Sequence, residues 1–153
     1  MFGTAQEDHS QRAHAVAGLG AVDFPTSCIA MAQESISRAV ALLHSFGYEE
    51  ARIAFNDAVK TDPACAMGHW GVARTWYHPI WAPPSPDEMR QGAAALDRAL
   101  AANAKTARER DYINALAVFY TDWQTVDHTT RAKNYEQALR RVRERNPRPG
   151  PDR

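Results

Sequence analysis

The sequence predicts an all-α fold, a short right-handed α-solenoid of about three helix-turn-helix hairpins. Apolar side chains recur at helical spacing through nearly every segment, and no strand-like alternation of apolar and polar residues lasts. The segments form six predicted helices joined by short turns, which indicates antiparallel helix pairs. With 153 residues, the chain is long enough for one domain with a sizeable core.

The first helix is predicted over residues 27–46, with Ser27 as its cap and Gly47 ending it. The second helix is predicted over residues 48–60. It ends before Pro63, because the residue that precedes a proline is pushed out of the α region. The apolar stripes of these two helices are Ile36, Ala39, Val40 and Leu43, and Ala51, Phe55, Ala58 and Val59.

The third helix is predicted over residues 63–77, with Asp62 as its cap and Pro63 at its first position. The stretch "HPIWAPPSP", residues 78–86, carries four prolines and predicts a loop with some polyproline character.

Two capping boxes, "SPDE" from Ser85 and "TARE" from Thr106, predict the starts of the fourth and fifth helices. The sixth helix is predicted over residues 128–145. The expected organisation is an N-terminal arm over residues 1–22, a helical-repeat domain over 23–146 and a disordered tail over 147–153.

The stretch "GYEEARIAFNDAVKTDP", residues 47–63, resembles the second helix of the tetratricopeptide repeat. The residues that stand at the spacings of that repeat are Tyr48, Ala51, Phe55, Ala58 and Pro63. The following two helix pairs match it more loosely. The resemblance implies three tetratricopeptide-like hairpins over residues 32–147.

A closer resemblance rests on "VDFPTSC", "AVALLHSFGYEEA", "DPACAMGHWGVA", "HPIWAPP" and "AKTARERDYINAL". These segments are similar to a group of exported bacterial tetratricopeptide-repeat proteins of unassigned function. Proteins of that group are longer, which implies that this chain is a short version or a fragment. The resemblance also implies a periplasmic or extracellular location, whereas the residues alone leave a cytoplasmic location open.

The two cysteines, Cys28 and Cys65, bracket the first two predicted helices. From the residues alone, they are either two buried thiols or a disulfide that closes about 37 residues and stabilises the fold by roughly 3–4 kcal/mol. The export implied by the resemblance favours the disulfide, because disulfides persist in oxidising compartments.

Charge is unevenly distributed along a chain whose formal net charge is zero. Residues 1–104 hold 7 Lys/Arg against 11 Asp/Glu, and residues 105–153 hold 11 against 7. The opposed halves favour head-to-tail association, and the small basic excess argues against nucleic-acid binding. No apolar run is long enough to span a membrane, and the first 22 residues lack the pattern of a signal peptide.

Candidate binding residues lie where first helices of repeats would line a concave surface. The combination of aromatic, arginine and histidine side chains suits a peptide or an acidic tail. The candidates are His44, Trp70, Arg74, Tyr77, His78 and Trp81, with Gln33 and Met67 beside them. The alternative for Trp70 and Tyr77 is a place in the core. The separate alternative for Trp81 is that it and Ile80 pin their loop to the body.

No metal site, cofactor or catalytic residue is expected. The six histidines include no pair at i, i+4, and the chain has no Gly-rich phosphate loop or plausible Cys-His nucleophile. A metal site built from His44, His69 and His78 is the weaker alternative. The charged stretch "RERDYI", residues 108–113, is interpreted as a solvated helix start.

The leading functional prediction is a non-catalytic helical-repeat protein that binds a protein or peptide partner through its concave surface or its ends. The alternative is an exported structural subunit that self-assembles end to end into oligomers or filaments. A third, weaker alternative is a metal- or cofactor-binding enzyme domain.

Overall fold

The computed structural model describes residues 23–79 and 82–147, and within them it contains six α-helices and no strand. This confirms the all-α prediction. None of the helices in this part of the chain has the length and the apolar character needed to cross a membrane. The helices are α2 (Ala30–His44), α3 (Tyr48–Thr61), α4 (Ala66–Thr75), α5 (Pro86–Ala101), α6 (Ala107–Tyr120) and α7 (His128–Arg145).

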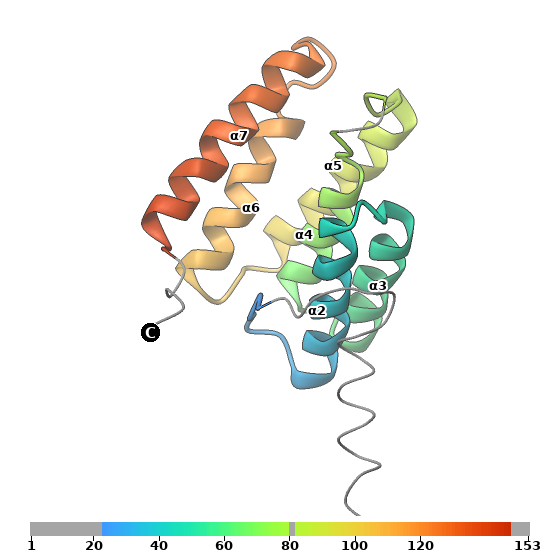
Figure 1. The fold of residues 1–153 in the computed structure, drawn as a ribbon, viewed down its shortest axis with the longest axis vertical. Coiled ribbons are helices and arrows are strands. Elements are labelled where there is room, and N and C mark those ends of the chain that lie inside the picture. Colours follow the sequence, from blue (N-terminus) through green and yellow to red (C-terminus); the bar gives the residue numbers. More distant parts are fainter. Residues whose placement is uncertain (1–22, 80–81, 148–153) are drawn as a thin grey trace, which may run out of the picture.

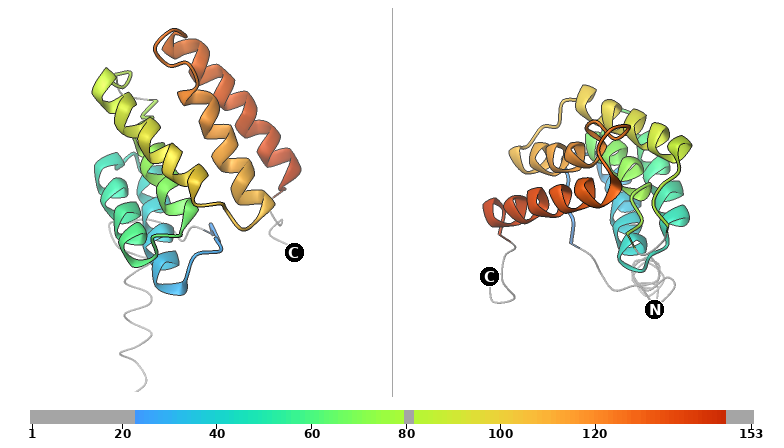
Figure 2. Two further views of the ribbon diagram at one scale, coloured as in Figure 1. Left: turned by 180° about the vertical axis from the view of Figure 1, so that it is seen from behind. Right: turned by 90° about the horizontal axis from the view of Figure 1, so that it is seen from above.

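The helices pack as consecutive pairs, α2 with α3, α4 with α5 and α6 with α7 (Figure 1). The pairs follow one another in chain order (Figure 2). Contacts between pairs run from α3 to α4 and from α5 to α6, and α4 also touches both α2 and α6. The first helices of the three pairs therefore adjoin one another in series. We call the surface that they share the α2/α4/α6 face.

Two predicted caps are wrong. Helix α2 begins at Ala30 after Ile29, and the hydroxyl of Ser27, expected to cap this helix, donates instead to the carboxylate of Glu109 at 3.0 Å. Helix α4 begins at Ala66, and its cap is Cys65, whose sulfur accepts from the N–H of Gly68 at 3.2 Å. Both predicted caps instead have long-range partners, since Ser27 bonds to Glu109 and Asp62 accepts from the N–H of Ile29.

The turn between α2 and α3 also differs from its prediction. Gly47 was expected to break the first helix, but the left-handed position belongs to Phe46, with φ 61°. The N–H of Gly47 bonds back to the carbonyl of Leu42 at 2.9 Å, which closes the helix end in the manner of a Schellman motif. A left-handed backbone is unfavourable for a bulky residue such as Phe46, and the side chain of Phe46 is 51% exposed.

The capping boxes have two different outcomes. At α5 the box is complete, because Ser85 accepts from the N–H of Glu88 and the Glu88 carboxylate accepts from the N–H of Ser85. At α6 the hydroxyl of Thr106 accepts from the N–H of Glu109 at 3.1 Å, but the carboxylate of Glu109 accepts from hydroxyl groups rather than from the cap's backbone. Glu109 is thereby available for a contact outside its own helix.

Close packing between helix pairs depends on small residues. A Cβ at Gly71 of α4 would lie 2.0 Å from Cδ1 of Phe55 in α3, so only glycine allows this approach of the two helices. A Cβ at Gly92 would likewise collide with the hydroxyl of Tyr120, which donates to the carbonyl of Ala73 at 2.6 Å. These contacts join α3 to α4, and α5 and α6 to α4.

Candidate functional site

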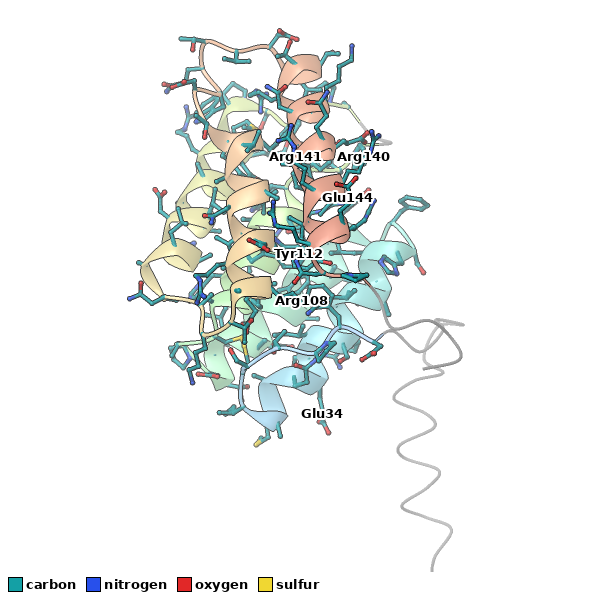
Figure 3. All side chains as sticks on the ribbon, turned by 90° about the vertical axis from the view of Figure 1, so that its left-hand side faces the viewer. Glu34, Arg108, Tyr112, Arg140, Arg141 and Glu144 are labelled. Atoms are coloured by element: carbon teal, nitrogen blue, oxygen red, sulfur yellow. A yellow bond between two sulfur atoms is a disulfide. The ribbon has the colours of Figure 1, made fainter. Side chains whose placement is uncertain are left out.

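The non-helical segment over residues 23–29 lies against the α2/α4/α6 face. Figure 3 shows it next to Arg108 and Tyr112, which α6 directs to this side of the molecule. The ring of Phe24 stacks on Trp70 of α4, with centroids 5.5 Å apart and planes at 13°, and meets the ring of Tyr112 at 5.4 Å in an edge contact. The three rings form an aromatic cluster that joins the segment to two helices.

Arg108 covers this aromatic cluster from α6. Its guanidinium carbon lies 5.0 Å from the centroid of Phe24 and 5.2 Å from that of Tyr112, within the range of cation–π attraction. Its Nη1 donates to the carbonyl of Pro25 at 3.0 Å. One side chain therefore contacts both a ring and the backbone of the segment.

Gln33 of α2 binds the backbone of the segment at two positions. Its Oε1 accepts from the N–H and the hydroxyl of Thr26, at 2.8 and 2.7 Å. Its Nε2 donates to the carbonyl of Phe24 at 2.9 Å and to the hydroxyl of Ser37 at 3.1 Å. Because an amide offers both a donor and an acceptor, it can satisfy an N–H and a carbonyl of an extended chain together.

Glu109 contradicts the prediction that residues 108–113 form a solvated helix start, because it is only 2% exposed. Its carboxylate accepts from the hydroxyl of Ser27 at 3.0 Å and from that of Thr106 at 2.9 Å. A buried carboxylate is costly unless hydrogen bonds compensate it, so these two donors matter to the fold as well as to the segment.

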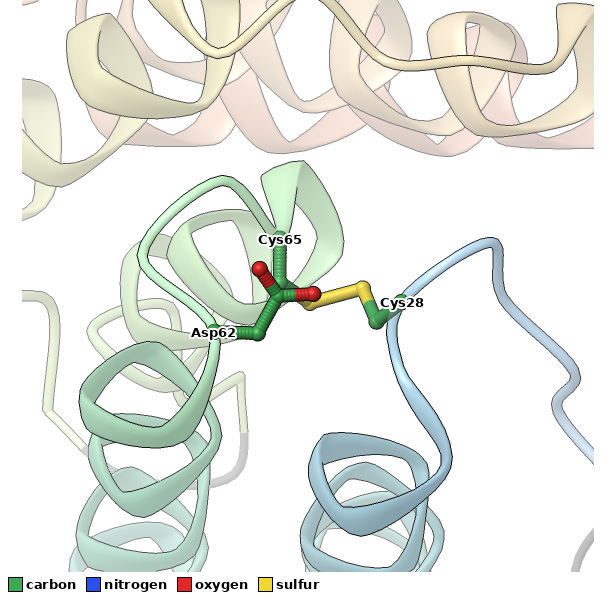
Figure 4. A group of neighbouring side chains, drawn as sticks. All are labelled: Cys28, Asp62 and Cys65. Carbon is green, nitrogen blue, oxygen red and sulfur yellow. A yellow bond between two sulfur atoms is a disulfide. The ribbon is translucent and has the colours of Figure 1, made fainter.

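A disulfide between Cys28 and Cys65 fixes the end of the segment (Figure 4), as the resemblance implied. The Cα atoms of the two residues are 5.1 Å apart. Asp62, at the end of α3, accepts from the N–H of Ile29 at 3.1 Å. Ligand atoms of Asp62 and both cysteines lie within 4.8 Å of one another, but sulfurs that are bonded to each other offer no thiolate to a metal.

Three of the predicted groove residues are buried. Met67 is inaccessible, and Trp70 and Tyr77 are 6% and 4% exposed. Of the two roles considered for Trp70 and Tyr77, the core is therefore the correct one. Trp70 nevertheless belongs to the site, because it supplies the surface on which Phe24 stacks. Its indole Nε1 is buried without a hydrogen-bond partner in the described structure.

The remaining predicted site residues do not meet in one place. Arg74 is half-buried, and its Nη1 donates to the carbonyl of Tyr77 at 2.6 Å. His78 lies 3.5 Å from the carboxylate of Glu88, and His44 is exposed in the last turn of α2. Trp81 lies outside the described residues. Within the described ranges, His44, His69 and His78 do not form a group that could hold a metal ion.

An open cleft of about 380 Å³ lies away from the segment, near the start of α3. Arg52 occupies part of it, with its guanidinium carbon 3.3 Å from the centroid of Trp76 and its Nε donating to the hydroxyl of Thr75 at 3.0 Å. The backbone N–H of Ser85 chiefly lowers the pKa of Glu88 in this cleft. The cleft is lined by Phe46, Tyr48, Glu49, Glu50, Arg52, Trp76, His78 and Glu88.

A smaller open cleft of about 300 Å³ lies between the end of α4 and the start of α7. Tyr77 and His128 contribute to its wall, with ring centroids 6.3 Å apart. Burial lowers the pKa of His128, and nearby Arg131 lowers it further. Both effects favour the neutral form of this imidazole.

In comparisons with known proteins, no family model, no curated protein and no solved structure matches this chain. The candidate site therefore has to be interpreted from its own contacts.

Sequence reasoning missed the central residues of this site, namely Phe24, Arg108, Glu109 and Tyr112. A weak indication was present, because Phe24-Pro25 is an aromatic-proline pair just before a cysteine, outside any predicted helix. Its position on the α2/α4/α6 face depends on Trp70 and Gln33, which come from two different helices.

Proposed function

We propose that this chain is a non-catalytic helical-repeat protein that binds an extended segment of a partner protein on its α2/α4/α6 face. In this proposal the three helix pairs are tetratricopeptide-like hairpins of a short right-handed solenoid, and the first helices line its recognition surface. The order of the contacts between pairs supports this arrangement, since each first helix adjoins the next.

The observation that carries the proposal is the chain's own segment 23–29 seated on that face. Gln33 and Arg108 bond to its carbonyl and N–H groups, which every peptide possesses. Trp70 and Tyr112 hold its aromatic side chain. Backbone contacts that give affinity, combined with a side-chain site that gives specificity, are typical of peptide recognition.

A peptide-display selection tests this proposal. The bait is the full chain carrying Phe24→Ala and Cys28→Ser, so that the chain's own segment competes less. Enriched peptides are expected to carry an aromatic residue and to bind at least about tenfold more weakly when Gln33→Ala or Arg108→Ala is added, because each change removes backbone contacts. Ser37→Ala is the matched control. Peptides that bind all these variants equally would place the binding site elsewhere.

The disulfide supports a periplasmic or extracellular location, because structural disulfides are rare in reducing compartments. Mass measurement after thiol alkylation of protein from its native compartment tests this location. Two free thiols there would contradict it.

The second candidate function is a structural subunit that assembles end to end. The charges of the end pairs favour it: α7 exposes arginines at 140, 141, 143 and 145, two of which Figure 3 labels, and the α2/α3 pair exposes Glu34, Glu49 and Glu50. Light scattering across concentration and salt separates the candidates. A salt-sensitive increase in mass with concentration supports assembly, whereas a monomer under all conditions excludes it.

A further inference from the structure

Segment 23–29 is held on the α2/α4/α6 face at two covalent points. It continues through Ile29 into α2, and Cys28 joins it to Cys65 at the start of α4. While it is in place, the ring of Phe24 fills the position between Trp70 and Tyr112. A partner segment that uses the same contacts can therefore bind only after residues 23–28 have left the α2/α4/α6 face.

The two sulfurs differ in their surroundings. Cys28 is partly exposed, whereas Cys65 is 2% exposed and caps α4, where its sulfur accepts from the N–H of Gly68 at 3.2 Å. A helix N-terminus stabilises a thiolate at this position. The negative charge of Asp62 and the burial of Cys65 oppose that effect, so the greater exposure of Cys28 is what decides which sulfur is attacked. An incoming thiolate would thus attack Cys28, and Cys65 would be the leaving group.

We propose that residues 23–28 are an intramolecular occupant of the partner site, that the Cys28–Cys65 disulfide locks them there, and that reduction by a dithiol opens the face to a partner segment. This inference rests on the proposed function. In the reaction, the dithiol's thiolate bonds to the sulfur of Cys28, and the electron pair of the broken S–S bond goes to Cys65. The second thiol of the reductant then releases Cys28 and forms the oxidised cyclic disulfide, while two electrons and two protons reach the two cysteines.

The contacts of the occupant specify the chemistry of the partner segment. The position between Trp70 and Tyr112 takes a flat aromatic ring. Pro25 offers its carbonyl to Arg108 and has no N–H that would be left unpaired. The N–H and hydroxyl of Thr26 both donate to Gln33. The ligand class is therefore an extended segment with an aromatic residue followed by proline and then threonine or serine.

The tether determines how strongly the occupant competes. After reduction, residues 23–28 remain attached to α2, and such a short connection gives an effective concentration in the millimolar range. The apparent Kd for an external segment is its intrinsic Kd divided by the fraction of molecules whose face is open. Reduction raises that fraction, and removal of the Phe24 ring raises it further.

Fluorescence anisotropy with a labelled peptide tests the inference on the full chain. The probe has the sequence of residues 23–29 with Cys28→Ser, and the control peptide also carries Phe24→Ala. We expect the oxidised protein not to bind the probe at micromolar concentration. Reduction with a phosphine, verified by alkylation and mass, is expected to tighten the apparent Kd at least about tenfold, and the control peptide not to bind.

Two protein variants complete the experiment, and circular dichroism verifies that each is folded. Cys28→Ser without reductant is expected to match the reduced parent chain. Adding Phe24→Ala is expected to tighten the Kd about another tenfold, because the internal competitor then lacks its aromatic anchor. Since the reduced parent chain contains no substitution, its result stands even where a variant fails to fold.

Distinct failures separate the inference from the function on which it rests. Equal binding of the probe by oxidised and reduced protein would refute the disulfide lock and leave the peptide site intact. Failure of the folded Cys28→Ser/Phe24→Ala chain to bind the probe would overturn the site and the lock together. A dimer that forms on reduction, and that Phe24→Ala abolishes, would assign the opened face to a second copy and contradict a separate partner.

Discussion

Replacing Gln33 with alanine is expected to loosen segment 23–29 while leaving the helices as stable as before. The Gln33 amide makes three hydrogen bonds to the segment, of 2.7, 2.8 and 2.9 Å, to Thr26 and Phe24. A truncated side chain leaves those groups to water alone. The segment then keeps its disulfide, its stacking and its contacts with α6.

The size of the effect follows from these bonds. Each net intramolecular hydrogen bond contributes about 0.5–1.5 kcal/mol, and water partly replaces those at a half-buried site. The loss is therefore about 2–3 kcal/mol in the free energy that holds the segment closed. At 1.4 kcal/mol per factor of ten, local opening becomes roughly 30- to 150-fold more frequent.

Hydrogen exchange followed by mass spectrometry measures this opening. In oxidised Gln33→Ala protein, amides of residues 23–29 are expected to exchange faster by that factor, while peptides from α6 and α7 keep their rates. Ser37→Ala is the matched control, because the Ser37 hydroxyl accepts from Nε2 of Gln33 within α2. Unchanged exchange in residues 23–29 would refute the role of Gln33, and faster exchange throughout would show that the change is global.

Three further predictions concern stability. Cys28→Ser removes a crosslink across a separation of 37 residues and should lower the free energy of unfolding by about 4 kcal/mol. Circular dichroism should show this loss as a lower thermal midpoint, and an unchanged midpoint would contradict the prediction. Gly71→Ala places a methyl 2.0 Å from Phe55, so overpacking should cost about 3 kcal/mol, of which the better helix propensity of alanine recovers about 1 kcal/mol, for a net loss of about 2 kcal/mol. Thermal unfolding of this variant with and without Phe55→Leu measures the loss, and a stability equal to that of the parent chain would refute the close approach. Burial raises the pKa of Tyr120, so its phenol ionises at lower pH in the unfolded chain than in the folded one, and the free energy of unfolding falls as pH rises above about 10. Tyr120→Phe should reduce that alkaline loss while costing about 1–2 kcal/mol at neutral pH, and equal slopes of stability against pH in the variant and the parent chain would contradict this role of Tyr120.

The sequence was most informative where a helix signal is complete within one turn. The box at Ser85–Glu88 forms as predicted, because both of its hydrogen bonds join residues three apart. The helix over residues 128–145 agrees with α7, whose cap, Asp127, accepts from the N–H of Thr130 within the same turn. Interactions of this range need no knowledge of the rest of the fold.

The sequence-based predictions were wrong where a side chain that could cap its own helix bonds instead to a residue far along the chain. Asp62 looks like a helix cap, yet it binds the N–H of Ile29, and Ser27, a second apparent cap, bonds to Glu109, 82 residues away. A side chain has few hydrogen-bonding positions, so a distant partner with better geometry replaces the local one. Glu109, interpreted as solvated from its charged neighbours, is buried for the same reason.

By itself, the sequence determined the all-α class and the pairing of successive helices, which follow from periodicity and turn residues. For the two cysteines, the residues left both free thiols and a disulfide open, and the structure shows the disulfide. Only the tertiary structure decided that residues 23–29 lie on the α2/α4/α6 face. That site is assembled from Gln33, Trp70, Arg108 and Tyr112, which three helices contribute, and their convergence depends on how the helix pairs pack rather than on any spacing along the chain.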